Sequence, residues 1–261
     1  MILAVNIGNS KIALGLMEDG AVRARFALST DQSRTEDEYA VLIRDVLSLG
    51  DVSPRDISDA VISSVVPTLN EPIARAIGRQ CTGVKPMIVG AGVKTGLNIR
   101  IDNPAQLGCD LAVAAVGALE HRSAPLVIIS MGTATTFMVI DQSGSLIGVS
   151  IASGVGLSVS ALATSASLLP QVQINIPKSC IGTNTADCMR SGAVYGTASM
   201  IDGMIERIER TLGYPVDAVA TGDHAELITH ECFREVAVDP DMLFTGLYKI
   251  LIKNRKNGKI R

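Results

Sequence analysis

Two stretches of this sequence follow the same pattern, and that pattern constrains the fold more than any other feature. One apolar run leads to Gly8 near the N-terminus, and another leads to Gly132 in the middle of the chain. A small polar residue stands two positions before each glycine, Asn6 in the first stretch and Ser130 in the second, and another apolar run follows. Such a pattern is typical of two strands joined by a tight glycine turn. The repetition predicts a chain of two related halves.

The residues that follow each stretch support this interpretation. In the first half, Asp19 and Gly20 predict a hairpin turn into a third strand. Thr35 followed by Glu38 predicts a helix that starts with a capping box. In the second half, residues 141–144 predict the corresponding turn into a third strand. Three strands before a helix, twice, predict a mixed α/β fold with two similar lobes and a cleft between them.

Three glycines interrupt the longest helical pattern, which covers residues 186–212. They are Gly192, Gly196 and Gly203. Interior glycines at this density indicate close packing against another helix rather than a weak helix. The sequence leaves open whether that packing lies within the chain or in a dimer.

Other segments carry weaker signals. Residues 152–156 are expected to form a flexible loop that leads into a helix over 157–169, and residues 242–253 are expected to form the last helix. Residues 249–261 contain six Lys or Arg and form the only basic cluster. A solvated, frayed terminus is the favoured interpretation of that cluster.

Composition excludes several classes of function. The formal net charge is −3, aromatic residues make up 3% and Trp is absent, which argues against a nucleic-acid partner. The five cysteines form no CxxC pair, so a disulfide framework or a zinc site is not expected and a cytoplasmic location fits best. The sequence shows no run of 18 apolar residues, so no membrane-spanning segment is expected.

The two glycine turns suggest phosphate binding. A turn of this kind exposes successive backbone N–H groups, and such a nest binds anions without a cationic side chain. Hydroxyl groups near the turns can donate further hydrogen bonds, from Ser10, Thr133, Thr135 and Thr136. The sequence contains neither a Walker loop nor a GxGxxG dinucleotide motif after a strand. A phosphate site and a pair of ordinary β-turns both remain open.

Asp110 is the residue with the clearest choice between a structural and a chemical role. It follows Gly108 and Cys109 and precedes an Ala- and Val-rich helical segment, so it lies in or near the first turn of a helix. A carboxylate there can cap the helix and interact with its dipole. It can also act as a base if it points into a cleft, and the residues alone favour the cap. Cys109 has no basic neighbour and is interpreted as a small loop residue.

Several separated motifs, in the right order, give the chain a resemblance to a known family. The motifs are Ile7-Gly8-Asn9-Ser10, Asp37-Glu38-Tyr39, Ser63-Ser64-Val65-Val66-Pro67, Thr95-Gly96-Leu97, Asp102-Asn103-Pro104, Gly108-Cys109-Asp110, Gly132-Thr133-Ala134-Thr135-Thr136, Leu169-Pro170, Gly182-Thr183-Asn184-Thr185, Ser191-Gly192 and Thr221-Gly222. Over residues 1–250 the chain resembles the type III pantothenate kinases, members of the superfamily that contains actin, acetate kinase and sugar kinases.

The resemblance implies a fold and an activity. The fold would be two duplicated ribonuclease H-like lobes of the actin-like ATPase type, residues 1–120 and 121–261, with a nucleotide cleft between them. The activity would be ATP-dependent phosphorylation of pantothenate in coenzyme A biosynthesis, by a cytoplasmic homodimer. Mg²⁺ and a monovalent cation, K⁺ or NH₄⁺, would be required.

The resemblance also implies roles for individual residues. Asp110 matches the catalytic base, and Ser130 stands at the position of the monovalent cation. The positions that match ATP contacts are Asn6, Gly8, Asn9, Ser10, Lys11, Gly132 and Thr133. The positions that match contacts to the acceptor substrate are Ile101, Gly108, Cys109, Leu111 and Thr185.

Four of these positions depart from the family pattern. The family has Asp at the positions of Asn6 and Ser130, Arg at that of Leu111 and Tyr at that of Ile101. Three of the changes, at Asn6, Ser130 and Leu111, remove charges that would attract a hard cation or bind an anionic group. Each lost partner typically costs a few kcal/mol, or roughly a hundredfold in binding or rate. Three expectations remain open: a weakened pantothenate kinase, an inactive paralogue that acts as a ligand- or partner-binding dimer, and an enzyme with an altered acceptor.

Overall fold

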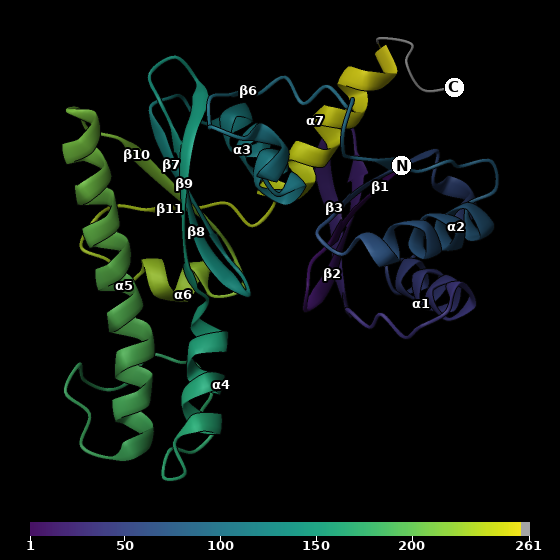
Figure 1. Ribbon diagram of the computed structural model, residues 1–261. Helices are drawn as coiled ribbons and strands as arrows, with labels where there is room; N and C mark the ends of the chain where they lie inside the picture. Colours follow the sequence, from purple (N-terminus) through teal and green to yellow (C-terminus); the bar gives the residue numbers. More distant parts are fainter. Residues whose placement is uncertain (257–261) are drawn as a thin grey trace. The chain divides into compact units, whose positions relative to one another are not determined.

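The computed structural model describes residues 1–256, which form two compact units (Figure 1). The first unit contains residues 1–97, 103–120 and the C-terminal segment from 241, and the second contains residues 98–102 and 121–240. The sequence predicted a boundary between residues 120 and 121. That boundary would put residues 98–102 in the first unit and the segment from 241 in the second, whereas the structure places them the other way round. No helix within residues 1–256 has the length and apolar character needed to cross a membrane.

The first unit is a five-stranded sheet with helices on both faces. Its strands have the order β3-β2-β1-β4-β5, antiparallel between β1, β2 and β3 and parallel between β1, β4 and β5. The strands are β1 (Ile2–Ile7), β2 (Lys11–Glu18), β3 (Ala21–Ser29), β4 (Asp59–Ser64) and β5 (Met87–Ile88). The helices are α1 (Glu36–Leu49), α2 (Asn70–Gln80), α3 (Cys109–His121) and α7 (Met242–Lys256), with 3-10 turns at Pro54–Asp56, Pro67–Leu69 and Pro104–Gln106.

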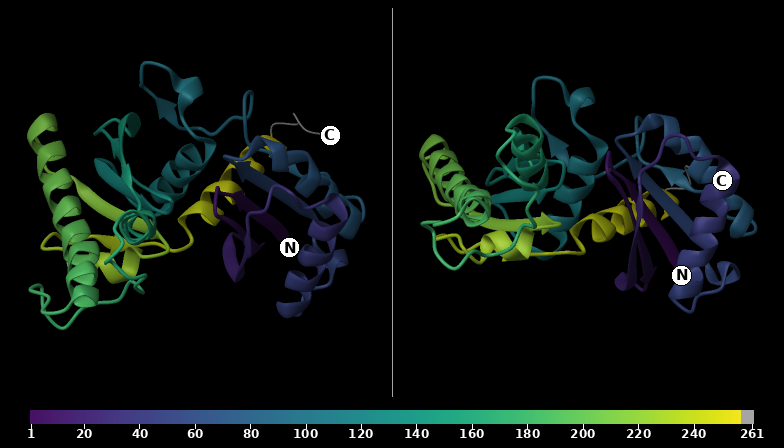
Figure 2. Two further views of the ribbon diagram at one scale, coloured as in Figure 1. Left: turned by 60° about the horizontal axis from the view of Figure 1, so that its bottom comes forward. Right: turned by 90° about the horizontal axis from the view of Figure 1, so that it is seen from below.

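The alternation of side chains along β1 gives this unit two apolar layers. Leu3 and Val5 pack with buried residues of α1 and α2 on one face, and Ala4 packs with residues of α3 and α7 on the other. The predicted capping box at Thr35 starts α1, because the Thr35 hydroxyl and the Glu38 carboxylate each bond the other's backbone N–H. Figure 2 shows the yellow helix α7 lying against β1 and β4.

Helices α3 and α7 meet at their backbones. A Cβ atom on Gly117 of α3 would lie 1.9 Å from the Met242 carbonyl oxygen, and one on Gly246 of α7 would lie 2.0 Å from that of Val113. Only glycine permits helices to approach this closely, because any side chain would overlap the opposite backbone. This contact fixes where α3 lies, and α3 carries Asp110.

The expectation of a frayed basic terminus is wrong for residues 249–255. They belong to α7, and the Arg255 guanidinium forms a bidentate ion pair with Asp59 of β4. Its Nε atom lies 2.8 Å from Oδ2 and its Nη2 atom 2.5 Å from Oδ1. Asn254 is buried and bonds both the backbone N–H and the carbonyl of Lys94. A paired charge and a satisfied amide hold the helix end in place. The rest of the predicted tail, residues 257–261, lies outside the described residues.

The second unit repeats the topology of the first. Its sheet has the order β11-β10-β7-β8-β9-β6, in which β7, β8 and β9 form an antiparallel meander and β10 and β11 run parallel to β7. The predicted duplication of three strands before a helix is therefore confirmed. The strands are β6 (Asn98–Ile99), β7 (Leu126–Met131), β8 (Ala134–Ile140), β9 (Ser145–Ser153), β10 (Asp217–Gly222) and β11 (Ala237–Val238), and the helices are α4 (Val155–Ser165), α5 (Thr185–Leu212) and α6 (Ala225–Thr229).

One prediction about this unit is wrong, and one of two open expectations about α5 is excluded. Residues 152–156 are not a loop: β9 continues to Ser153, and α4 begins at Val155 and ends at Ser165 rather than at 169. Pairing with β8 extends the strand through polar residues that carry no strong strand signal. The glycines of α5 do not mark close packing within the described chain, since a Cβ atom on Gly192, Gly196 or Gly203 would meet nothing within 4 Å.

These contrasting glycines give the first prediction. Gly117→Ala should destabilise the protein by about 3 kcal/mol, because the added methyl group overlaps the α7 backbone, which cannot move aside without shifting the helix. Gly203→Ala, also in a helix, should stabilise it by up to about 1 kcal/mol through helix propensity. Urea unfolding of both variants measures the difference. Equal stabilities would contradict the backbone contact between α3 and α7.

Candidate active site

The first glycine turn joins β1 to β2 and is fixed from the side by Thr30. The Gly8 N–H donates to the Lys11 carbonyl at 2.9 Å. The Thr30 hydroxyl donates to the Gly8 carbonyl at 2.7 Å, and the Thr30 N–H donates to the Ser10 carbonyl at 3.1 Å. The side chains at the tip of the turn are exposed. The carbonyl groups are thus held inside the protein while the tip faces solvent, as an anion-binding turn requires.

The ends of β1 and β4 place two neutral polar side chains beside this turn. The parallel register pairs Asn6 with Ser63, so both side chains lie on the same face of the sheet. The fully buried Ser63 hydroxyl donates to the Asn6 Oδ1 atom at 2.8 Å. A carboxylate here would be a charged acceptor, whereas the amide oxygen leaves the site uncharged.

The first turn of α3 brings Asp110 to the same unit. The Asp110 Oδ1 atom accepts a hydrogen bond from the Leu111 N–H at 3.0 Å. Burial raises the pKa of the Asp110 carboxyl above its ordinary value, and the bonds from the Leu111 and Asp110 N–H groups offset part of that rise. A Cβ atom on Gly108 would lie 2.6 Å from Oδ1, so glycine leaves room for the carboxyl group. Asp110 therefore combines a place in the first turn of α3 with the raised pKa of a candidate base.

Cys109 is not the loop residue that the sequence suggested. It is the first residue of α3, and its sulfur lies 3.3 Å from the Ser64 nitrogen and 3.0 Å from the Ser64 carbonyl oxygen. The thiol thus joins the start of α3 to the end of β4.

The second glycine turn joins β7 to β8 and is packed by two further glycines. The Gly132 N–H donates to the Ala134 carbonyl at 2.9 Å, and the Gly154 N–H donates to the Thr133 carbonyl at 3.0 Å. A Cβ atom on Gly154 would lie 2.0 Å from the Gly132 carbonyl oxygen, and one on Gly222 would lie 2.0 Å from a neighbouring backbone oxygen in β7. The start of α4 and the end of β10 therefore press directly on the turn. Its tip, Gly132 and Thr133, is exposed.

Three hydroxyl side chains form a row beside this turn. Ser130 of β7 lies directly opposite Thr136 of β8 and Thr221 of β10, so the three share one face of the sheet. Thr136 is 7% exposed, and its hydroxyl has no hydrogen-bond partner within the described residues. A buried hydroxyl without a partner costs stability, and it is free to donate to a bound anion.

The remaining positions implied by the resemblance are spread over both units. Leu111 follows Asp110 in α3 and is half-buried. Ile101 lies just after β6 and is half-buried, and Thr185 is the exposed first residue of α5. The N-cap of α5 is Asn184, which accepts a bond from the Asp187 N–H at 3.0 Å.

Sequence reasoning did not assign a role to Thr30, Ser63 or Thr221. Thr30 holds the first turn through its hydrogen bond to Gly8. Strand register places Ser63 beside Asn6 and Thr221 beside Ser130. These neighbours could have been predicted if the duplication had been used to pair β1 with β4 and β7 with β10 as parallel strands. Ser63 would then lie beside Asn6, and Thr221 beside Ser130. The order of strands in a sheet is not a local property, so no motif gave that signal.

The donor atoms at the two positions that the resemblance relates to cations are neutral. Asn6 offers an amide oxygen that already accepts from Ser63, and Ser130 and its neighbours offer hydroxyls. Within the described part of the chain, no group of three or more His, Cys, Asp or Glu side chains converges. Because Mg²⁺ is bound mainly by carboxylates and phosphates, these residues do not fit a magnesium ion held by the protein alone.

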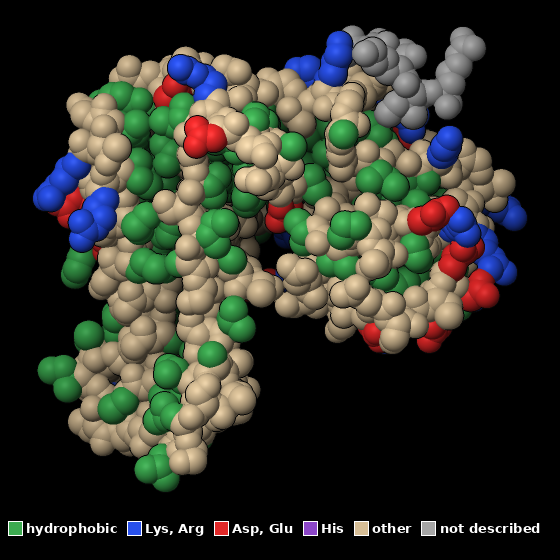
Figure 3. Space-filling model, in the orientation of Figure 1, with side chains coloured by type: hydrophobic (Ala, Val, Ile, Leu, Met, Phe, Trp, Pro, Cys, Tyr) green, Lys and Arg blue, Asp and Glu red, His purple; other side chains and the backbone are tan. Residues whose placement is uncertain are grey.

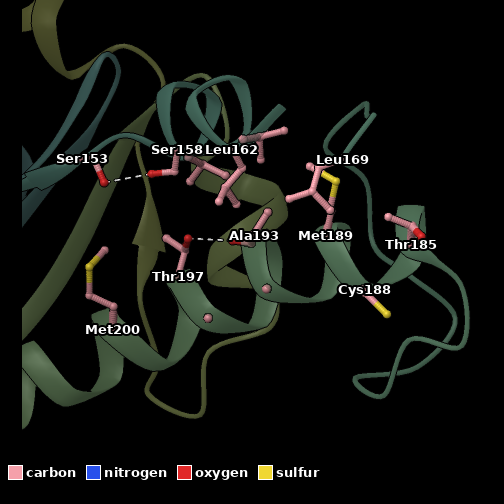
Figure 4. A pocket seen from close by; sticks show the side chains of 14 residues that line it. Ser153, Ser158, Leu162, Leu169, Thr185, Cys188, Met189, Ala193, Thr197 and Met200 are labelled. Carbon is pink, nitrogen blue, oxygen red and sulfur yellow. Dashed lines mark hydrogen bonds between the residues drawn. The ribbon is translucent and has the colours of Figure 1, made fainter. Parts of the chain in front are cut away.

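A groove of about 400 Å³ lies between α4 and α5 of the second unit (Figure 4). Leu162 and Val159 of α4 face Met189, Ala193 and Met200 of α5 across it. Ser153 and Ser158 hydrogen-bond at 2.8 Å at one end. Around the lower end of α4 in Figure 3, the visible side chains are hydrophobic or neutral polar.

Comparison with known proteins gives the family. The model of the type III pantothenate kinase family matches residues 2–207. The chain belongs to this family. The type III pantothenate kinase of Brevibacillus brevis is 38% identical to it over 255 residues, which cover 98% of this chain and 100% of that protein.

Solved structures show the same fold at much lower identity. A protein from Sinorhizobium meliloti described as a 2-dehydro-3-deoxygalactonokinase matches with a TM-score of 0.60 and 13% identity, over 97% of this chain and 96% of that one. The activator of a 2-hydroxyisocaproyl-CoA dehydratase from Clostridium difficile, solved with bound ADPNP, matches with a TM-score of 0.55 and 11% identity, over 100% and 98%. At these identities the likeness shows only the fold, the duplicated α/β architecture of sugar kinases and actin-like ATPases.

The unpaired hydroxyl in the row gives the second prediction. Thr136→Val should stabilise the protein by about 1 kcal/mol, because it removes a buried polar group without a partner and keeps the shape of the side chain. Thr30→Val should instead destabilise it by about 1 kcal/mol, because that hydroxyl is bonded to Gly8. Thermal unfolding of both variants tests the contrast. A loss of stability in Thr136→Val would show that the hydroxyl has a partner.

Proposed function

We propose that this protein is an ATP-dependent kinase of pantothenate, the reaction for which its family is named. The observation that carries the proposal is the position of Asp110, a largely buried carboxyl at the start of α3 in the unit that also carries the first glycine turn. Burial raises its pKa, and a base is most effective when its pKa lies near the working pH. The match of the family model to residues 2–207 names the reaction class.

In the proposed reaction, the hydroxyl oxygen of pantothenate attacks the γ-phosphorus of ATP. The bond to the β,γ-bridging oxygen breaks, ADP leaves with the bonding electrons, and the Asp110 carboxylate accepts the hydroxyl proton. Backbone N–H groups and hydroxyls at the glycine turns, from Ser10, Lys11 and Thr133, bind phosphate oxygens. The proposed contacts to the acceptor are Gly108, Leu111, Ile101 and Thr185, together with the backbone of Cys109, whose thiol is bonded to Ser64. Mg²⁺ bound to the ATP phosphates would supply charge neutralisation without ligands from the protein.

The neutral residues Asn6, Ser130 and Leu111 should limit the rate of phosphoryl transfer. Each replaces a charged group expected from the family pattern, and each loss costs roughly a hundredfold where the charge acts on the transition state. The hydroxyl row can recover part of this by donating to phosphate oxygens. We therefore expect a slow kinase with little dependence on K⁺ or NH₄⁺.

The same neutral positions favour a second candidate function. A protein with intact glycine turns and without cation ligands can still bind ATP or pantothenate and act as a ligand-binding dimer. Binding without turnover, measured by calorimetry on the folded protein, would support this alternative over the kinase.

We further propose that the protein is a homodimer whose interface includes the groove between α4 and α5. Residues 142–177 contain no charged side chain. Leu157 and Leu162 of α4 are 51% and 50% exposed. The open space at Gly192 and Gly196 would admit the side chains of a second copy. Such an uncharged apolar surface is typical of an obligate interface.

The role of Asp110 gives the third prediction. Asp110→Asn should lower the pantothenate-dependent kcat by about 10²–10⁴-fold, because the amide cannot accept the proton. Stability should rise at neutral pH. The folded-state pKa lies above the unfolded one, so keeping the carboxyl ionised costs folding free energy, and the neutral amide removes that cost. Coupled ADP-release assays and thermal unfolding measure the two effects.

The pH profile is the control for this assignment. In the wild type, kcat/KM should rise through a pKa above the ordinary value of 3.8, because the base must be ionised. An Asp110→Asn variant that keeps wild-type turnover would remove Asp110 as the base. A folded wild type that binds ATP but shows no turnover with pantothenate would overturn the kinase proposal.

The proposed interface gives the fourth prediction. Leu162→Glu should convert the dimer to a monomer, because it places a charge in an apolar interface. Val41→Glu is the matched control, since Val41 is 44% exposed and lies on α1 of the first unit. Sedimentation velocity gives the masses. A monomeric wild type, or a dimeric Leu162→Glu variant, would place the interface elsewhere or exclude it.

A further inference from the structure

The end of β4 extends beyond its neighbouring strand. The short strand β5 pairs with Val61 and Ile62 of β4, and the last bond on that side runs from the Val89 N–H to the Ile62 carbonyl at 2.7 Å. β4 continues to Ser64. The Ser64 N–H and carbonyl therefore need another partner, because unpaired backbone groups in a half-buried position are costly.

The thiol of Cys109 supplies both missing bonds. The Ser64 N–H donates to the Cys109 sulfur at 3.3 Å, and the Cys109 S–H donates to the Ser64 carbonyl at 3.0 Å. One side chain thus takes the place of the absent strand. The sulfur also lies 3.6 Å from the Ser63 hydroxyl, which bonds Asn6 of β1. A continuous network therefore joins the start of α3 to the ends of β4 and β1.

We propose that Cys109 is a positioning residue for the phosphoryl transfer. Its thiol anchors the first turn of α3 to the end of β4, and this sets where the carboxyl group of the adjacent Asp110 lies relative to Asn6 and the first glycine turn. The inference rests on the proposed function, because it assigns Asp110 as the base. The anchoring itself is independent of activity, since it depends only on the bonds to Ser64.

The geometry explains why a small displacement would matter. A Cβ atom on Gly108 would lie 2.6 Å from the Asp110 Oδ1 atom, so the carboxyl group fits closely against the backbone before the helix. Loss of the thiol would remove these bonds between the end of β4 and the first turn of α3. Misplacement of a catalytic group by about 1 Å can cost up to a hundredfold in rate.

Three variants test the proposal. Cys109→Ala removes both bonds, and Cys109→Ser keeps a donor and acceptor on a similar side chain. Cys81→Ala is the control, because Cys81 is a buried thiol of the apolar core in the same unit. We expect Cys109→Ala to lower kcat about tenfold or more with KM changed less than about twofold. Cys109→Ser should recover most of the rate, and Cys81→Ala should lose stability but keep kcat.

Hydrogen exchange at the Ser64 amide, followed by NMR, tests the bonds between the Cys109 thiol and Ser64 without any assay of activity. Exchange should be faster in Cys109→Ala than in the wild type, and Cys109→Ser should restore much of the protection. Unchanged exchange at Ser64 overturns the anchoring. Faster exchange with unchanged kcat overturns the positioning role, as does an equal loss of kcat in the Ser and Ala variants.

The proposed kinase function and the proposed anchoring by Cys109 can be contradicted by different results. If the wild type shows no turnover with pantothenate, the proposed function fails and with it the assignment of Cys109 to phosphoryl transfer. The exchange at Ser64 then still decides whether the thiol anchors α3 to β4.

Discussion

The backbone contact between α3 and α7 is the constraint on which the candidate active site depends. Gly117 and Gly246 let the two helices touch without side chains between them, and this contact leaves little freedom for the position of α3. Asp110, the proposed base, lies in the first turn of that helix. Cys109 then ties the same turn to the sheet. The helix that carries Asp110 is thus held at its start by the thiol and in its interior by α7, and a proposed catalytic group needs such a fixed position.

Each unit carries neutral hydrogen-bonding groups beside its own glycine turn. Asn6 bonds Ser63 in the first unit, and Ser130 lies between Thr136 and Thr221 in the second. Hydroxyl and amide dipoles stabilise an anion at short range but give little attraction at a distance, whereas carboxylates draw cations from several ångströms away. If these groups bind phosphate as proposed, binding would rest on contact geometry rather than on a metal held by protein carboxylates.

Local patterns predicted a large part of the fold. The repeated glycine turns, the capping box at Thr35 and the apolar periodicity of α5 depend on residues close in sequence, and each corresponds to an element of the structure. The position of Asp110 in the first turn of a helix was predicted in the same way. The assignment of sites by family resemblance stays a prediction, because the geometry alone tests no ligand contact.

The remaining features depend on residues far apart in the chain. Gly117 looks like one more small residue in an Ala-rich helix until α7 is placed beside it. Ser63 meets Asn6 only through the parallel register of β1 and β4. Cys109 had no local sign of its bonds, because its partner is 45 positions away in the sequence. The path of α7 back into the first unit could not be read from its amphipathic pattern, which fits many apolar surfaces.

The return of α7 also has a consequence for the order in which the protein is made. The ribosome synthesises β1 to α3 first, then the whole second unit, and α7 last. Until α7 emerges, the face of β1 and β4 that carries Ala4 and Val61 has no helix α7 to cover it. The first unit therefore completes its core only after the second has been synthesised, and a nascent chain has a prolonged need for protection of that apolar face.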